Sequence, residues 1–155
     1  MEPTSVEPLS APEDASLKEL YTYWLAKRGQ QAAPPKSAIN PSELKSLLSH
    51  IGIMDVVGTP PSFHVRLFGT SLASAYGEDI TGRNRDELDL NGVSQKIRVF
   101  LERAVHECQP QSFRAQYTKE TGRHLKYEQI NLPLSDDGKK VNRLLIGIAV
   151  QHAFG

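Results

Sequence analysis

FHVRLFGTSLASAYGEDITGRNRDEL, residues 63–88, is the stretch of sequence that decides the fold. The alternation of apolar residues predicts a strand that buries Phe63, Val65 and Leu67 on one face and breaks at Gly69. The apolar positions that follow recur at helical spacing as far as Gly77, and a second break comes at Thr81-Gly82. A strand that runs directly into short helical turns separated by glycines makes a wall and a lid, which is typical of a pocket for a small molecule.

Length, charge and cysteine content restrict the class of protein. The chain has 155 residues, with 18 basic and 18 acidic side chains, so it carries no basic surplus of the kind that binds nucleic acid. Its one cysteine, Cys108, excludes an internal disulfide and fits a reducing compartment. The polar, proline-rich residues 1–14 contain no signal peptide or membrane span, so we expect a disordered lead-in, then a single domain over residues 15–152 in the cytoplasm.

An amphipathic helix is predicted near the N-terminus. Ser16 and Glu19 form a capping box, and Gly29 follows the last turn. Five large apolar residues recur at helical spacing and predict one buried stripe: Leu17, Leu20, Tyr21, Trp24 and Leu25. The stripe fits either a helix that packs on its own sheet or a contact between two subunits.

The order of the remaining elements predicts an α+β domain. We expect a five-stranded antiparallel sheet with short helices and one longer helix on one face, in addition to the N-terminal helix. The strands are predicted at residues 51–57, 63–68, 112–119, 125–134 and 141–150, and the longer helix at residues 93–108.

Several short motifs, in the order in which they occur over roughly residues 17–150, resemble the PAS sensory domain. The amino-acid sequence of these motifs is similar to that of the small, single-domain proteobacterial branch of the family. The motifs are Tyr23-Trp24, Ile39-Asn40-Pro41, Ile53-Met54-Asp55-Val56, Arg66-Leu67 with Gly69-Thr70, Tyr76-Gly77, Asp79 with Thr81-Gly82-Arg83, and Leu132-Pro133-Leu134-Ser135 with Asp137-Gly138.

The resemblance implies a bacterial, non-enzymatic sensory or protein-interaction module with a ligand pocket between sheet and helices. No kinase, cyclase or DNA-binding segment follows residue 150, so we expect signalling by contact with a partner protein or in a homodimer, without nucleic acid or membrane insertion. The alternative is a small-molecule carrier or an enzyme that uses the same cavity.

No cofactor or metal is expected. The resemblance implies that a haem ligand would lie on the long helix, but His106 falls off the apolar stripe of that helix and is predicted to face solvent. The reactive cysteine motif of flavin photosensors is missing, and Cys108 falls among predicted buried residues. The histidines lack metal-ligand spacing.

Candidate ligand-binding residues are Arg66, Leu72, Tyr76, Ile97, Leu101 and Tyr117. Arg66 lies between apolar residues, where a charge needs a partner, so it either pairs with Glu128 or Asp55 or recognises an anion. The tyrosines at 76, 117 and 127 could supply hydroxyl groups to a pocket, and each is equally well explained as a core aromatic residue.

Overall fold

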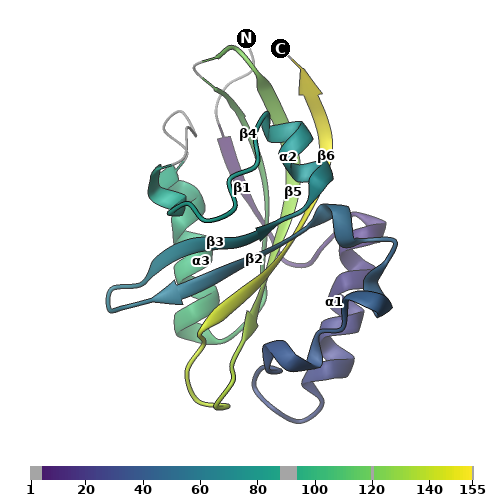
Figure 1. Ribbon diagram of the computed structural model, residues 1–155, viewed down its shortest axis with the longest axis vertical. Helices are drawn as coiled ribbons and strands as arrows, with labels where there is room; N and C mark the ends of the chain where they lie inside the picture. Colours follow the sequence, from purple (N-terminus) through teal and green to yellow (C-terminus); the bar gives the residue numbers. More distant parts are fainter. Residues whose placement is uncertain (1–4, 88–93, 120, 155) are drawn as a thin grey trace.

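The computed structural model describes residues 5–87, 94–119 and 121–154. Its framework is one antiparallel sheet of six strands in the order β1-β4-β5-β6-β2-β3 (Figure 1). The α+β class is therefore confirmed, and the sheet has one strand more than the five expected. The strands are β1 (Ser5–Leu9), β2 (Ile51–Val57), β3 (Ser62–Phe68), β4 (Gln111–Thr118), β5 (His124–Leu134) and β6 (Arg143–Phe154).

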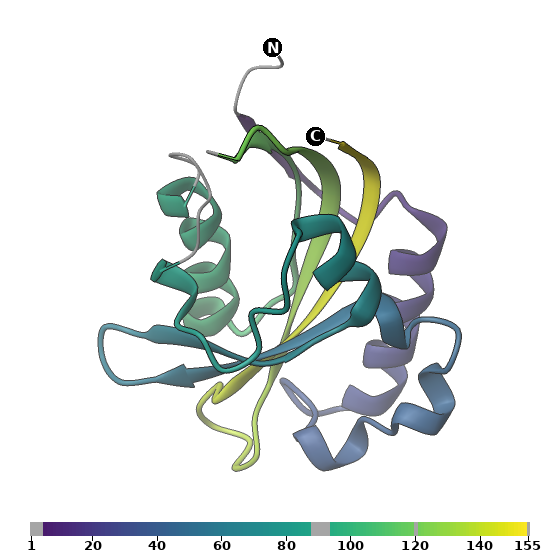
Figure 2. The ribbon, with the colours of Figure 1, turned by 45° about the horizontal axis from the view of Figure 1, so that its top comes forward.

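Helices cover both faces of the sheet. We call the face under α2 (Thr70–Tyr76) and α3 (Ser94–Glu107) the inner face, and the face under α1 (Ala15–Arg28) the outer face. Figure 2 shows α1 and α3 on opposite sides of the sheet. The start of the long helix predicted at residue 93 lies outside the described residues. Short 3-10 turns complete the chain: η1 (Lys36–Ala38), η2 (Pro41–Leu44), η3 (Leu48–His50) and η4 (Arg85–Glu87).

The additional strand, β1, corrects the prediction for the N-terminus. Ser5–Leu9 pairs antiparallel with β4, so the expected disordered lead-in is wrong for these residues. Pairing at a sheet edge is made by main-chain groups and tolerates proline, so a polar, proline-rich composition does not exclude it.

A bulge in the β2–β3 hairpin changes which side chains face inward. Ile53 pairs with Leu67 and Met54 pairs with Val65, so Arg66 is the extra residue between them. An extra residue reverses the alternation of faces. Leu67, predicted on the buried face, is consequently 43% exposed, and Phe68 faces the inner core in its place.

The N-terminal helix α1 packs on the outer face of its own sheet, as the first of the two interpretations predicted. Leu17, Leu20 and Trp24 are buried, whereas Tyr21 and Leu25 are partly buried against the same cluster. The helix begins two residues earlier than the capping box at Ser16 predicted, because the N-cap is Asp14, whose side chain accepts hydrogen bonds from the amides of Ser16 and Leu17.

The distance between α1 and the sheet is set by a close approach of the helix to β6. A Cβ atom at Gly147 would lie 2.6 Å from Leu20 Cδ2 and 3.0 Å from Leu17 Cδ2. Only a residue without a side chain lets the helix come this near to the sheet. Among the described residues, no helix combines the length and apolar character needed to cross a lipid bilayer.

Candidate functional site

A cavity of about 80 Å³ lies on the inner face, between the sheet, α2, η4 and α3. A single buried water molecule needs roughly 10–15 Å³ of cavity volume, so this cavity is large enough for a small organic molecule. Most of the wall is apolar, from Met54, Phe68, Leu72, Ala75, Ile80, Ile97, Leu125, Ile148 and Val150. The polar side chains on the wall are Tyr76, Arg85, Tyr117, Tyr127 and Gln129.

Two groups on β5 present polar atoms to this cavity. Tyr127 and Gln129 are 7% and 4% exposed and lie two residues apart, hence on one face of the strand. Gln129 Nε2 donates to Asn131 Oδ1 at 2.7 Å. Within the described part of the chain, neither the Tyr127 hydroxyl nor Gln129 Oε1 has a hydrogen-bond partner. Both residues line the cavity, so these two atoms mark a place where a bound polar group would be stabilised.

Among the described residues of the wall, Arg85 alone carries a charged side chain. Arg85 is 1% exposed, although arginine is seldom fully buried. Burial raises the pKa of the Tyr127 phenol, and the nearby Arg85 charge offsets only part of that effect. Tyr127 therefore stays protonated at neutral pH and can act as a hydrogen-bond donor beside a cation.

Arg85 is positioned by main-chain bonds between the loop after α2 and the edge of the sheet. Val65 N donates to Arg83 O at 2.9 Å, and Gly82 N donates to Val65 O at 2.6 Å. Asn84 forms an isolated bridge with His64. The loop is thus paired with β3, and η4 begins directly over the cavity.

The lid of the cavity is α2, and its C-terminal end is held by two basic side chains. Gly77 adopts a left-handed conformation with φ of 108° that ends the helix, as its position in the sequence predicted. Lys119 Nζ donates to Tyr76 O at 2.9 Å, and Arg123 donates to Ala75 O and Ser74 O. These cations satisfy carbonyl groups that helix geometry leaves free and suit the negative end of the helix dipole.

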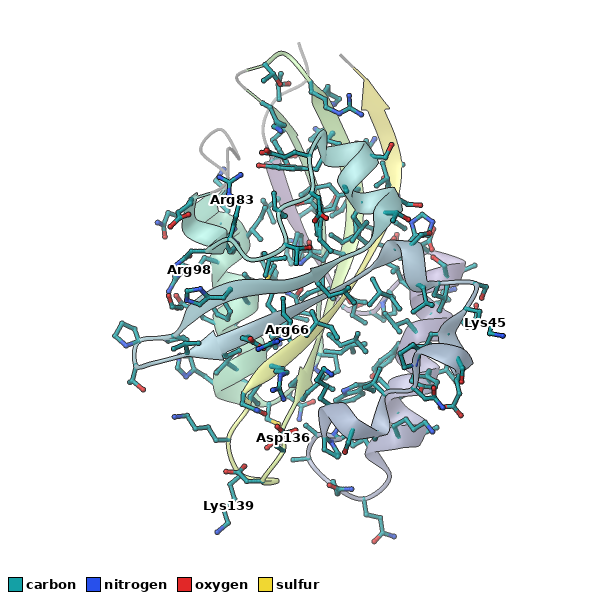
Figure 3. The ribbon with its side chains drawn as sticks, in the orientation of Figure 1. Lys45, Arg66, Arg83, Arg98, Asp136 and Lys139 are labelled. Carbon is teal, nitrogen blue, oxygen red and sulfur yellow. The ribbon has the colours of Figure 1, made fainter. Side chains whose placement is uncertain are left out.

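Four of the six predicted ligand-binding residues lie together on the cavity wall: Leu72, Tyr76, Ile97 and Tyr117. Leu101 does not line the cavity, because it lies one turn beyond Ile97 and is fully buried in the inner core. Arg66 does not line it either. Figure 3 shows Arg66 on the β2–β3 hairpin, in the region of Asp136.

Arg66 makes the ion pair that the sequence predicted, with Asp55 rather than Glu128. Its Nε lies 2.8 Å from Asp55 Oδ2, and Asp55 also pairs with Arg143 at 3.2 Å. The expectation of a buried pair is wrong, since the Arg66 side chain is 57% exposed. The bulge at this residue turns the side chain out to solvent.

Glu128 has a different role, on the outer face directly behind the cavity. Its carboxylate is 1% exposed and accepts from Glu13 N at 2.8 Å and from Asp14 N at 3.1 and 3.2 Å. Arg114 holds the same segment through Glu13 at 2.5 Å. The junction of β1 and α1 is therefore fastened to β5 at the residue between Tyr127 and Gln129.

Two further residues, His106 and Cys108, were considered as possible cofactor ligands. His106 is exposed on α3, as predicted. Cys108 is a free thiol at partial burial, and burial raises its pKa. In the described ranges, no group of three or more His, Cys, Asp and Glu side chains could hold a metal ion.

A model of the PAS domain family matches residues 13–149. The chain belongs to the PAS domain family. PAS domains are generally sensory modules, and this PAS domain has the antiparallel sheet and the helical lid of that fold. No curated protein matches it.

Solved structures similar to this PAS domain include light-oxygen-voltage domains. One, studied with a flavin analogue, is 17% identical, with a TM-score of 0.54 over 72% of this chain and 83% of the other. An RNA-binding light-oxygen-voltage receptor is 13% identical, with a TM-score of 0.56 over 96% of this chain and 38% of the receptor. The PAS domain of an HTR-like protein from Haloarcula marismortui is 18% identical, with a TM-score of 0.47 over 70% of this chain and 89% of the other. The first two structures, with TM-scores above 0.5, show a shared fold and, at such low identity, nothing beyond the fold.

Sequence reasoning missed Arg85 and Gln129 on the wall of this PAS domain. Arg85 follows a glycine-containing turn, where hydrophobic periodicity carries no information. Gln129 could have been found, because it alternates with Tyr127 and Asn131 on one face of a strand whose other face carries Ile130, Leu132 and Leu134.

Proposed function

We propose that this PAS domain is a non-enzymatic sensory module that binds a small molecule in the inner-face cavity. In this proposal, ligand binding changes the strength of the hydrogen bonds that attach residues 5–14 to β5. A partner protein or a second copy of the chain then responds to the changed position of this segment. One observation carries the proposal. Tyr127 and Gln129 line the cavity, and Glu128 between them holds the amides of Glu13 and Asp14 on the outer face.

The geometry of a strand supports such coupling. Successive side chains point to opposite faces of the sheet, so a shift of β5 that accommodates a ligand at Tyr127 or Gln129 also moves Glu128. Hydrogen bonds weaken steeply with distance and angle, and the bonds from Asp14 N are already 3.1 and 3.2 Å long. A small displacement is therefore enough to change how firmly the junction is held.

The composition of the wall favours binding over catalysis. Its described polar groups are phenols, an amide and a guanidinium, and none of its described residues offers a carboxylate, imidazole or thiol. Those three groups supply most acid–base and nucleophilic catalysis. An enzyme or carrier that uses the cavity is the alternative function.

The experiment combines a ligand screen with hydrogen exchange on the full-length protein. A library of small aliphatic and aromatic compounds is screened by ligand-observed NMR against the wild type and against Ala75→Leu, which narrows the cavity. Compounds that bind only the wild type occupy the cavity. We expect them to change the exchange rates of the Glu13 and Asp14 amides in the wild type and to leave those of Ala75→Leu unchanged.

Two results would contradict the proposal. If cavity compounds bind and the two amides exchange as before, β5 does not link the cavity to the N-terminal segment. If no compound distinguishes the wild type from Ala75→Leu, the cavity is not a binding site.

A further inference from the structure

We infer that the cavity binds a small, uncharged aliphatic carbonyl compound, whose oxygen accepts a hydrogen bond from the Tyr127 hydroxyl. The inference rests on the proposed function and specifies the class of ligand for the same cavity. It follows from three properties of the described wall: a donor without a partner at Tyr127, a single charge that is already engaged, and a compact hydrocarbon surface.

The Tyr127 hydroxyl is a donor that is held in position and has no hydrogen-bond partner among the described residues. Its ring makes edge contacts with the rings of Phe113 and Tyr117, whose centroids lie 6.4 and 6.1 Å away. Tyr127 is 7% exposed, and burial raises the pKa of its phenol, so the hydroxyl stays protonated at neutral pH and donates. A ligand oxygen opposite this hydroxyl gains a hydrogen bond in surroundings of low polarity, where such a bond is strengthened.

The charges around the cavity favour an uncharged ligand. Arg85 carries the one charge among the described wall residues, and it already interacts within the chain, so it does not require an anion. A cation would meet the positive charge of Arg85, and no carboxylate among the described wall residues could balance it. An ion of either sign would therefore lose its hydration without a partner that compensates for the loss.

The amides of Gln129 and Asn131 do not alter this assignment. They bond each other at 2.7 Å, and turning both amides over keeps that bond with donor and acceptor exchanged. Tyr76 and Tyr117 already interact within the chain. The fixed requirement of the described wall is therefore an acceptor for Tyr127. A carbonyl oxygen meets it and has no proton of its own to place, whereas an alcohol brings a proton that needs a further acceptor.

The apolar part of the wall and the volume determine the rest of the ligand. Leu72, Ile97, Leu125, Ile148 and Val150 present hydrocarbon side chains to the cavity. The volume of about 80 Å³ is roughly five to eight times the space that one water needs, so a compound of about five non-hydrogen atoms fits. Burial of its hydrocarbon atoms supplies the driving force for binding, and the carbonyl group supplies the selectivity.

The test compares three compounds of the same size and nearly the same shape: butan-2-one, 2-methylbut-1-ene and propanoate. The alkene carries a methylene group in place of the carbonyl oxygen, and the acid carries a charged oxygen in place of a methyl group. Dissociation constants are measured at neutral pH by NMR chemical-shift titration of the isotopically labelled full-length protein. We expect saturable binding of the ketone to the wild type. Propanoate should not bind in a saturable manner, and none of the three compounds should bind to Ala75→Leu.

The variant Tyr127→Phe isolates the proposed hydrogen bond. It keeps the ring and its contacts, and it should lower the affinity for the ketone relative to the alkene about three- to tenfold, the size expected for one hydrogen bond. Because the two compounds fill the cavity equally, their ratio cancels any change in packing. Tyr21→Phe, on the outer face, is the matched control and should leave the ratio unchanged. Without ligand, Tyr127→Phe should have the Tm of the wild type, because the hydroxyl that it removes has no partner among the described residues.

The results separate this inference from the proposed function. The inference is wrong if Tyr127→Phe leaves the ratio of ketone to alkene affinity unchanged, or if propanoate binds more tightly than the ketone. A clear loss of Tm in ligand-free Tyr127→Phe would also overturn it, because the hydroxyl would then have a partner within the protein. In each of these cases the proposed function stands if other compounds of the screen separate the wild type from Ala75→Leu and change the exchange of the Glu13 and Asp14 amides. If no compound of either set separates the wild type from Ala75→Leu, both are wrong.

Discussion

Trp24 offers the most direct test of how α1 is held on the sheet. The indole is fully buried in the outer cluster, and its Nε1 donates to Pro133 O at 2.8 Å. Two variants separate the contributions of packing and hydrogen bonding. Trp24→Phe keeps most of the ring and removes the N–H donor, whereas Trp24→Ala removes both.

The magnitudes follow from the burial. Replacing a fully buried tryptophan by alanine costs about 3–5 kcal/mol in the free energy of unfolding. Trp24→Phe leaves the Pro133 carbonyl without its donor and should cost about 1–3 kcal/mol. Since a domain of this size is stable by about 5–15 kcal/mol, the alanine variant should retain the fold with a much lower Tm.

The assay is urea unfolding followed by far-ultraviolet circular dichroism, because the chain has one tryptophan and both variants lose its fluorescence. Thr22→Ala, at an exposed position of the same helix, is the control and should change the stability by less than about 0.5 kcal/mol. In the wild type we expect blue-shifted Trp24 emission that does not depend on protein concentration. A loss below about 1 kcal/mol for Trp24→Ala, or emission typical of a water-exposed indole, would refute the packing described for α1.

Three further predictions concern separate parts of the fold. Gly147→Ala should lower the stability by about 1–3 kcal/mol, because the new methyl group meets Leu20 and Leu17, and an unchanged denaturation midpoint would show that α1 can move away without cost. Arg66→Met should cost at most about 1 kcal/mol, since the arginine of its ion pair is mostly solvent-exposed, and a larger loss in urea unfolding would indicate a buried charge. Asp14→Ala should cost about 0.5–2 kcal/mol as the loss of an N-cap. Burial alone would raise the pKa of Asp14, but hydrogen bonds from Ser16 and Leu17 outweigh it and hold the pKa below its ordinary value of 3.8. The stability contributed by Asp14 is therefore complete above that value and is lost as the pH falls through the lower folded pKa, so a variant that loses stability in acid as steeply as the wild type would contradict this assignment.

Local patterns were enough to predict the centre of the fold. Alternation followed by glycine breaks predicted strand β3 and the helix that ends at Gly77, and both are confirmed. The buried residues of α1 were also predicted correctly. Apolar residues recur at helical spacing on the buried side of a helix, whatever surface the helix covers.

What could not be predicted depends on contacts between residues far apart in the sequence. Strand β1 is fixed by pairing with β4 and by ion pairs from Arg114 to Glu7 and Glu13, none of which leaves a local signal. The bulge at Arg66 is set by the register of the partner strand, so a strict alternation placed Leu67 on the wrong face. The position of Arg85 over the cavity depends on loop bonds to Val65.

The same contacts indicate why residues 5–14 are suited to change their attachment to the sheet when a ligand binds, as the proposed function requires. The segment is held by the hydrogen bonds of an edge strand, by amide bonds to the Glu128 carboxylate that contribute about 1.5–3 kcal/mol each, and by a partly exposed ion pair to Arg114 that contributes about 0–1 kcal/mol. Segments with few buried contacts open at a lower free energy than the core does. A ligand that binds only one of two states shifts the balance by about 2.7 kcal/mol at one hundred times its Kd. That shift is comparable with one of the bonds to Glu128 and lies below the stability of the domain, so a ligand of ordinary affinity could loosen or strengthen the attachment of residues 5–14 while the two hydrophobic clusters stay intact.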